Sequence, residues 1–303
     1  PEPWHFPFED PAGAQGRSHA YQVERSRFDA LLLDNARRVG VAVREECVVS
    51  GVLRDGERVE GIRYRDILHR EHRVRAQYVV DASGHGSRLY PATGGERVFS
   101  RFFRNIAVFG YYEGGHRLPA PHEGGRLCAA FSTGWMWYVP LANGLTGVGA
   151  VVNREHVDLI RDDLQRALPE LVAACPPVRD LLVDARPVSD GDYGPVRIRK
   201  DYSYSNTRLW SPGLALVGDS ACFVDPLSSG VHLATYSALL AARSINSALS
   251  GRVAEKRAFE EFEARYRHEY RLIHNLLAVL YDMNNHEDSY FWTSRRITRT
   301  RAS

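Results

Sequence analysis

Residues 214–245, LALVGDSACFVDPLSSGVHLATYSALLAARSI, leave few folds open to this chain. They begin with a run of apolar side chains that predicts a short buried strand, and this strand ends at Gly218 and Asp219. A helical pattern then runs from Gly230 to residue 249. A buried strand that leads through a tight turn into a long helix is typical of α/β proteins, so we expect helices packed on a sheet.

The loop between this strand and this helix has the chemistry of a ligand site. Asp219 carries a carboxylate that accepts hydrogen bonds from sugar or ribityl hydroxyls. Ser228, Ser229 and Gly230 open the helix, whose first amides and dipole favour an anion. From the residues alone, an ordinary Asp turn followed by a capped helix remains the alternative.

A second stretch, YVVDASGHGSRL (78–89), combines a hydrophobic strand with a turn of small residues. The strand ends at Asp81, and the turn includes Gly84. A glycine has no Cβ to block the approach of phosphates or of a ribityl chain to the backbone. The residues do not separate a ligand-binding turn from a plain strand-to-loop connection.

The first part of the remaining chain predicts one helix and a β-meander. Residues 22–39 place apolar side chains at helical spacing, and Gly40 stops the pattern. The β-rich runs that follow carry a hairpin-type turn at 54–56 and end in a buried strand at 78–80.

The second part predicts a sheet followed by helices. Residues 105–153 are β-rich, include WMWYVP (135–140), and read as a separate antiparallel sheet. Residues 156–184 and about 253–282 are helical in pattern, and the last helix is expected to pack on the core.

Composition excludes several classes of function. The net charge of +2 gives no electrostatic case for nucleic acid or an anionic membrane, and no apolar run is long enough to span a bilayer. The sequence has no metal, glycosidase or Ser-His-Asp hydrolase motif. The four cysteines are too widely spaced for a zinc site or a dense disulfide framework, so we expect a reduced, cytoplasmic chain. They are Cys47, Cys128, Cys175 and Cys222.

The two motif stretches, in this order and on either side of a β-rich region, resemble the FAD-binding motifs of the aromatic hydroxylase class of flavoproteins. The resemblance implies an α/β fold with a glutathione-reductase-like FAD domain, an antiparallel β-sheet substrate domain and a helical C-terminal part. It implies that Arg25 reaches the cofactor, that Asp81 belongs to the Asp-Gly motif, and that Asp219 lies beside the ribityl chain. The further cofactor-binding residues that it implies are Gly84, Gly218 and Pro226.

The same resemblance divides the chain into functional segments. Residues 1–104 and 206–250 are expected to form the FAD domain, 105–205 mainly the substrate domain, and 251–303 a C-terminal helical region. The G-x-G-x-x-G turn that opens this fold is not found, and Gly84-His-Gly86 is the nearest echo. We therefore expect the N-terminal Gly-rich βαβ unit to be missing from this chain.

The segment WMWYVP narrows the resemblance. Trp135, Trp137 and Pro140 match the W-x-W-x-[IV]-P pattern of flavin-dependent halogenases, and i and i+2 on a strand point to the same face. The segments EPWHFPF, GVHLATYSALLAARS and SYFWTSRR are similar to the branch of that family acting on phenols or pyrroles.

The halogenase resemblance implies a mechanism. Reduced FAD and O2 give a C4a-hydroperoxide, chloride converts it to hypochlorous acid, and the tryptophans keep the organic substrate away from the flavin. Ser228, Ser229 and Gly230 would bind the halide, although the spacing after Pro226 is shorter than in the family. The family's catalytic lysine is expected upstream of Pro1, because Lys200 and Lys256 do not match it.

The implied partners are a separate NADH-dependent flavin reductase and an aromatic substrate on an acyl or peptidyl carrier protein, in natural-product or antibiotic biosynthesis. Two alternatives remain open at this point. One is an FAD-dependent monooxygenase or reductase of the same fold, and the other is an inactive scaffold that docks a carrier protein.

Overall fold

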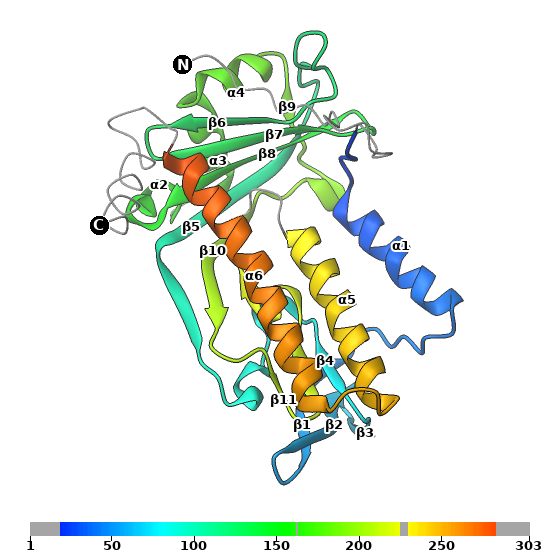
Figure 1. Cartoon of the computed structure of the whole chain (residues 1–303). Helices are drawn as coiled ribbons and strands as arrows, with labels where there is room; N and C mark the ends of the chain where they lie inside the picture. The colour runs from blue at the N-terminus through cyan, green and yellow to red at the C-terminus, as the bar shows by residue number, and fades with distance from the viewer. Residues whose placement is uncertain (1–18, 162, 225–229, 283–303) are drawn as a thin grey trace, which may run out of the picture. The chain divides into compact units, whose positions relative to one another are not determined.

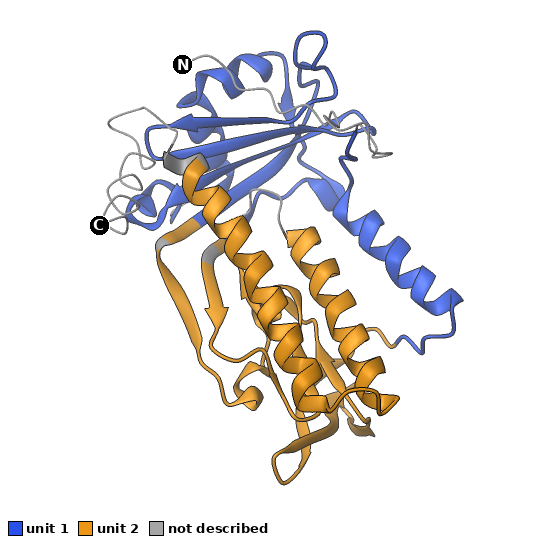
Figure 2. Cartoon of the chain, in the orientation of Figure 1, with its two compact units in different colours: residues 1–43, 106–199, 282–303 blue, residues 44–105, 200–281 orange. Residues whose placement is uncertain are grey.

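The computed structural model describes residues 19–161, 163–224 and 230–282. It forms two compact units, each assembled from separate stretches of the chain (Figure 2). Among the described residues, unit 1 comprises 19–43, 106–161, 163–199 and 282, and unit 2 comprises 44–105, 200–224 and 230–281. The four functional segments expected from the sequence do not coincide with these contact units, and that division stays a prediction.

Unit 2 contains the predicted β-meander. Strands β1 (Val48–Asp55), β2 (Arg58–Arg65) and β3 (Glu71–Arg75) pair antiparallel in the order β1-β2-β3. Gly56 has φ +54, a left-handed conformation that glycine adopts without steric cost, and it turns β1 into β2. The hairpin expected at 54–56 is confirmed.

A second sheet of unit 2 is parallel at its centre. Strand β4 (Val79–Asp81) pairs in parallel with β12 (Leu214–Leu216), and β11 (Trp210–Ser211) lies on the other side of β12. The sequence placed β4 at the end of the meander, whereas the structure pairs it with a strand more than a hundred residues later. Local pattern does not encode that long-range pairing, although it predicted both strands. The burial expected for residues 78–80 is wrong for Val80, which is 42% exposed.

Two long helices, α5 (Gly230–Leu249) and α6 (Glu255–Asp282), run side by side in unit 2 (Figure 1). The Ser244 hydroxyl donates a hydrogen bond to the Ala258 carbonyl near one end of the pair, at 2.9 Å. His232 lies 2.7 Å from Glu269 towards the other end, so the helices are antiparallel. The expected apolar stripe of α6 is confirmed in its first half, because three of its aromatic side chains are buried. They are Phe259, Phe262 and Tyr266.

Short elements complete unit 2. The 3-10 turns η1 (Gly84–Gly86) and η5 (Gly218–Ser220) follow β4 and β12, and η2 (Tyr90–Thr93) precedes β5. Strand β13 (Cys222–Phe223) follows η5 and pairs with β10 (Arg197–Asn206).

Unit 1 is built on the predicted antiparallel sheet. Strands β6 (Leu127–Phe131), β7 (Gly134–Pro140) and β8 (Leu145–Asn153) form a continuous antiparallel ladder, and β9 (Arg186–Pro187) pairs with the end of β5 (Arg97–Glu113). Strands β5 and β10 begin in one unit and end in the other.

The helices of unit 1 form where the sequence predicts them, but helix α1 differs from α3 in burial. Helix α3 (Leu164–Ala173) is capped by Asp163, whose side chain accepts from the Gln165 amide at 2.9 Å, and its apolar face is buried. Helix α1 (Arg25–Arg38) forms where the 22–39 pattern predicts a helix, but none of its side chains is buried, and Leu31 is 66% exposed. The remaining short helical elements are η3 (Arg154–His156), α2 (Asp158–Arg161), α4 (Pro176–Leu181) and η4 (Gly191–Tyr193).

Candidate functional site

The two motif stretches meet at one edge of the parallel sheet of unit 2. Leu216 on β12 pairs with Asp81 on β4, so the turns that follow both strands lie at their carboxyl ends. In open α/β sheets this edge is where ligands bind. Asp81 and Asp219, which are 138 positions apart in the sequence, therefore belong to one candidate site.

Asp81 is buried, and its carboxylate is held by its own turn. It accepts from the Ser83 amide at 2.9 Å and from the Ser83 and Ser87 hydroxyls. The Ser220 hydroxyl of η5 donates to the Asp81 carbonyl, which ties the two turns together. These contacts hold the Asp81 carboxylate within its turn, and the cofactor-binding part expected for Asp81 stays a prediction.

The Gly218–Asp219 turn is held on three sides by side chains. The Ser237 hydroxyl on α5 accepts from the Gly218 amide at 2.9 Å, and the Tyr266 hydroxyl on α6 donates to the Gly218 carbonyl at 3.2 Å. The Tyr204 hydroxyl on β10 donates to the Asp219 carbonyl. Gly218 itself has φ +57, which explains why a glycine occupies this position.

The Asp219 carboxylate differs from that of Asp81 because 32% of its side chain is exposed. Its Oδ2 atom lies 3.4 Å from Nδ1 of His85, which comes from η1. An accessible carboxylate at this edge is suited to accept hydrogen bonds from ligand hydroxyls.

The groups behind the turn stay neutral. Burial raises the pKa of the Tyr204 and Tyr266 hydroxyls above their usual range, and burial raises the pKa of the Cys222 thiol to about 12. These side chains were not singled out from the sequence. Tyr266 lies on the predicted last helix, Cys222 lies within the 214–245 stretch but was named only as one of four cysteines, and Tyr204 lies in neither motif stretch.

The site fits the ribityl side of a flavin. A Cβ built on Gly84 or Gly86 would meet no atom within 4 Å, so the backbone of η1 is open to close approach. The exposed Asp219 carboxylate supplies the acceptor that hydroxyl groups require. An accessible glycine backbone next to a hydrogen-bond acceptor is the arrangement that the resemblance to flavoproteins implies for the ribityl chain.

The tryptophan pair lies on β7 in unit 1. The rings of Trp135 and Trp137 are 5.9 Å apart, as expected for i and i+2 on one face. Trp135 is 4% exposed and Trp137 is half-buried, with Phe109 on β5 at 6.0 Å from the Trp137 ring. Pro140, the last residue of the pattern, is buried at the end of β7.

Space for the Trp137 indole comes from the neighbouring strand. Gly149 on β8 lies directly opposite Trp137, and a Cβ at Gly149 would be 2.1 Å from Cζ2 of that indole. The opposite face of β7 is anchored by Tyr138, whose hydroxyl donates to the His116 carbonyl at 2.6 Å. The position of the Trp137 indole is therefore fixed by the packing of β7 against β8.

Other predicted site residues have different surroundings. Arg25 belongs to unit 1, where its guanidinium pairs with Asp29 one turn along α1 at 3.0 Å. Gly230 is the first residue of α5, whereas Pro226, Ser228 and Ser229 lie outside the described residues. The roles of these residues in binding cofactor and halide stay predictions.

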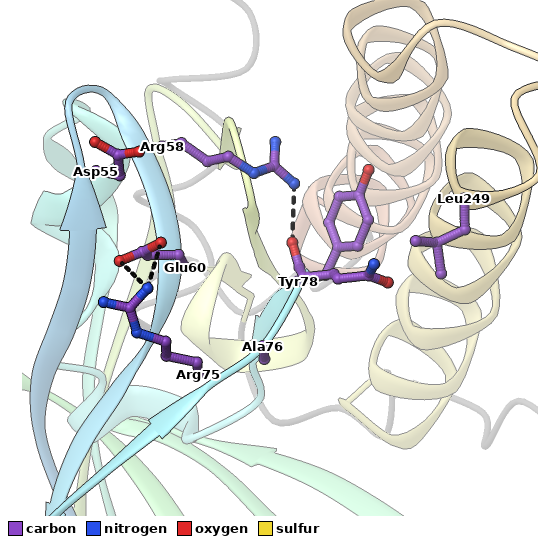
Figure 3. Close-up of a pocket in the computed structure, with 8 residues that line it drawn as sticks. Asp55, Arg58, Glu60, Arg75, Ala76, Tyr78 and Leu249 are labelled. Carbon is purple, nitrogen blue, oxygen red and sulfur yellow. Dashed lines mark hydrogen bonds and ion pairs between the residues drawn. The ribbon is translucent and has the colours of Figure 1, made fainter.

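A hollow of about 530 Å³ occurs elsewhere in unit 2 (Figure 3). It lies between β2, the start of β4 and the end of α5, while Asp81 is at the far end of β4. Its arginines are already paired, Arg58 with Glu255 and Arg75 with Glu60. Paired arginines leave this hollow without a free charge for an anionic ligand, so we do not assign it to the site.

Two negative results concern the described part of the chain. No cluster of three or more histidine, cysteine or acidic side chains in residues 19–161, 163–224 and 230–282 is arranged to hold a metal ion. The helices in these ranges also include none long and apolar enough to cross a membrane.

Solved structures define the class to which this fold is similar. The myxobacterial chondrochloren halogenase, described as a new variant of FAD-dependent halogenases, has a TM-score of 0.93 and 54% identity over 97% of this chain and 67% of its own. The flavin-dependent halogenase CmlS has a TM-score of 0.86 and 33% identity over 98% of this chain and 55% of its own. The mixed α/β fold, with antiparallel sheets and a helical C-terminal part, is thus a flavin-dependent halogenase fold.

The family model described as tryptophan halogenase matches residues 6–303, and the chain belongs to this family. A curated relative, the tryptophan 2-halogenase of Chondromyces crocatus, is 31% identical over 283 residues, which are 92% of this chain and 53% of that protein. The flavin-dependent halogenase ascD of Acremonium egyptiacum is 29% identical over 297 residues, with 89% and 52% covered. The chain spans about half the length of these curated relatives.

Proposed function

We propose that this protein is a halogenase that uses reduced FAD, O2 and chloride to chlorinate an electron-rich phenol or pyrrole held on a carrier protein. The observation that carries the proposal is the paired Trp135 and Trp137 wall, which matches the halogenase pattern in a chain of the tryptophan halogenase family. Membership of that family, and not the separate flavin motifs, favours halogenation over hydroxylation.

The overall reaction requires two electrons from the cofactor. Bound reduced FAD supplies them, so that FADH2, O2, chloride and one proton give FAD, hypochlorous acid and water. The aromatic ring then exchanges one hydrogen for chlorine, and the hydroxyl of hypochlorous acid leaves as water with that hydrogen. A separate NADH-dependent reductase restores reduced FAD.

We propose a role for the chain's own residues in binding FAD and the halide and in keeping the substrate away from the flavin. Asp219 accepts hydrogen bonds from the ribityl hydroxyls, and Gly84 lets that chain approach the backbone. Gly218 supports the site through its backbone conformation, with φ +57. In the halogenase pattern that Trp135 and Trp137 match, the indoles keep the aromatic substrate from contact with the flavin. Gly230, the first residue of α5, would bind the halide through its backbone amide. Ser228 and Ser229 are proposed to take part as well and lie outside the described residues.

The direct test uses the full-length gene product with a flavin reductase, NADH, FAD, O2 and chloride. Three acceptors are compared by high-resolution mass spectrometry: a phenol or pyrrole acid on a carrier protein, the same acid free, and free tryptophan. We expect the chlorine isotope pattern on the carrier-bound ring and its loss when chloride is omitted.

Each other outcome points to a different function. Chlorinated free tryptophan would keep the halogenase and overturn the carrier-bound substrate. A hydroxylated product that needs no halide would assign the protein to the monooxygenases of this fold. Failure to bind FAD, together with retained binding of the carrier, would identify a docking scaffold.

A further inference from the structure

The side chain of His85 occupies the junction of the two flavin motifs. It is the middle residue of η1, with Gly84 and Gly86 on either side, and it follows Asp81 by four positions. Neither flanking glycine has a neighbour within 4 Å of its Cβ position, so the imidazole is the bulky group of this turn.

Three groups surround the imidazole ring. Its Nδ1 atom is 3.4 Å from Asp219 Oδ2, its centroid is 4.2 Å from that of Phe223, and Tyr204 meets it edge-on at 5.6 Å. The two aromatic rings confine the imidazole, and the confined imidazole faces the carboxylate. The contacts come from η5, β13 and β10, so three elements fix this orientation.

The backbone of His85 is fixed independently by Arg97. Arg97 Nη1 donates to the His85 carbonyl at 3.0 Å, and its guanidinium lies 4.5 Å from the Tyr90 ring and 4.0 Å from the Tyr204 ring. The Nε and Nη2 atoms are buried without a hydrogen-bond partner among the described residues. Burying such donors costs free energy, and the two cation–π contacts with Tyr90 and Tyr204 offset part of that cost.

We propose that His85 is a positioning residue of the flavin site, which orients the Asp219 carboxylate for the ribityl chain of FAD. The inference rests on the proposed function, because it presumes that Asp219 binds the cofactor. The Nδ1 atom lies 3.4 Å from Oδ2 and limits the rotation of the Asp219 carboxylate, so the carboxylate loses less rotational freedom when FAD binds.

If the His85–Asp219 pair served only to stabilise the fold, removing the imidazole would lower the thermal stability of the protein. The side chains of His85 and Asp219 are 41% and 32% exposed, and pairs this exposed contribute little to folding stability. Removing the imidazole should therefore weaken FAD binding while it leaves the thermal stability of the flavin-free protein nearly unchanged.

The test measures FAD affinity by quenching of flavin fluorescence, with the full-length protein and oxidised FAD. His85→Phe keeps the ring against Phe223 but removes the nitrogen donor, and we expect the dissociation constant to rise about tenfold. His85→Asn retains a donor near the position of Nδ1 and should restore affinity to within roughly threefold of the wild type. The flavin-free melting temperature should stay constant in both variants.

Two further measurements make the inference specific. In a double-mutant cycle, His85→Phe should add little to Asp219→Asn, because the imidazole acts through that carboxylate. The matched control is His116→Phe, which removes the imidazole of an exposed His116–Asp184 pair in unit 1 and should leave FAD affinity unchanged.

The outcomes separate this inference from the proposed function. Unchanged FAD affinity in His85→Phe, additive effects in the cycle, or a large fall in flavin-free melting temperature would overturn the positioning role. A wild-type protein that does not bind FAD would instead overturn the proposed function.

Discussion

Among single residues, the half-buried Trp137 depends on a neighbour that has no side chain. Any Cβ at Gly149 would overlap the indole, so the glycine is required by close approach and not by its backbone conformation. Glycine inside a strand normally weakens that strand, and here the free volume it leaves is filled by an aromatic ring.

We expect Gly149→Ala to lower the free energy of unfolding by about 1–3 kcal/mol, because the added methyl overpacks the face that holds Trp137. Urea denaturation measures the loss, and tryptophan fluorescence reports the displaced indole. Gly124→Ala is the control, because its Cβ would meet no atom within 4 Å. Equal stability of the two variants would contradict the packing argument.

The sequence predicted part of the geometry around the two tryptophans. The alternation of side chains along a strand predicted that Trp135 and Trp137 share a face, and the ring distance agrees. Gly149 was not predicted, because the register between β7 and β8 is set by the turn and the partner strand, and not by either strand alone. The approach of His85 to Asp219 was not predicted either, because it depends on the pairing of β4 with β12, which are far apart in the sequence.

Helix α6 packs on the core and also fixes the turn after β12, through the hydrogen bond from the Tyr266 hydroxyl to the Gly218 carbonyl. Its aromatic spacing predicted burial, which is confirmed for Phe259 and Phe262. Periodicity does not show that the hydroxyls of Tyr266 and Tyr270 donate to the Gly218 and Phe223 carbonyls. Those hydrogen bonds depend on the tertiary packing of α6, which a local pattern does not contain.

Tyr266→Phe tests this hold on the turn. The change removes one hydroxyl and leaves the Gly218 carbonyl buried without that donor, so we expect the free energy of unfolding to fall by about 1 kcal/mol. Hydrogen exchange of the Ala221 amide, which bonds to the Gly218 carbonyl at 3.0 Å, should become faster. Tyr236→Phe on α5 serves as the control, and a similar change in exchange there would argue against a specific role for Tyr266.

The loop between β2 and β3 predicts a pH dependence. Hydrogen bonds from His72 and then Arg70 hold the pKa of Asp66 well below its usual 3.8. A lowered pKa in the folded state favours the charged carboxylate there, so its stabilisation is present above pH 3.8 and is lost as the pH falls through the folded pKa.

Asp66→Asn should therefore lower the melting temperature by a few degrees at neutral pH, and the gap to wild type should narrow in acid. Thermal unfolding followed by circular dichroism across this range measures the gap. Asp34→Asn removes an exposed carboxylate paired with Arg37 and is the control. A gap that is independent of pH would show that the Asp66 charge does not support the loop.

At the scale of the whole molecule, each unit is assembled from stretches that are distant in the sequence. Strand β4 needs β12 as its parallel partner, and 133 positions separate Asp81 at the end of β4 from Leu214 at the start of β12. Sequence pattern predicted the kinds of elements and the antiparallel sheet of unit 1. Local pattern did not predict the pairing of β4 with β12, because long-range pairing depends on contacts that no local window contains.

A chain that ends after Arg199 tests this dependence. It keeps β4 but lacks β12, α5 and α6, so we expect residues 79–81 to lose protection. Limited proteolysis with mass spectrometry should show cuts near β4 in the shortened chain and not in the complete one, while β6 to β8 remain protected in both. Equal protection of β4 would mean that it folds without its parallel partner.

The interrupted units also bear on how related genes can be recombined. A single crossover placed within residues 44–281 joins stretches from two parents in each unit, and so mixes two cores at once. Chimeras that exchange one intact unit need junctions at 43/44, 105/106, 199/200 and 281/282 together. Libraries designed on these four junctions should therefore yield more folded hybrids than libraries with the same number of junctions placed at random.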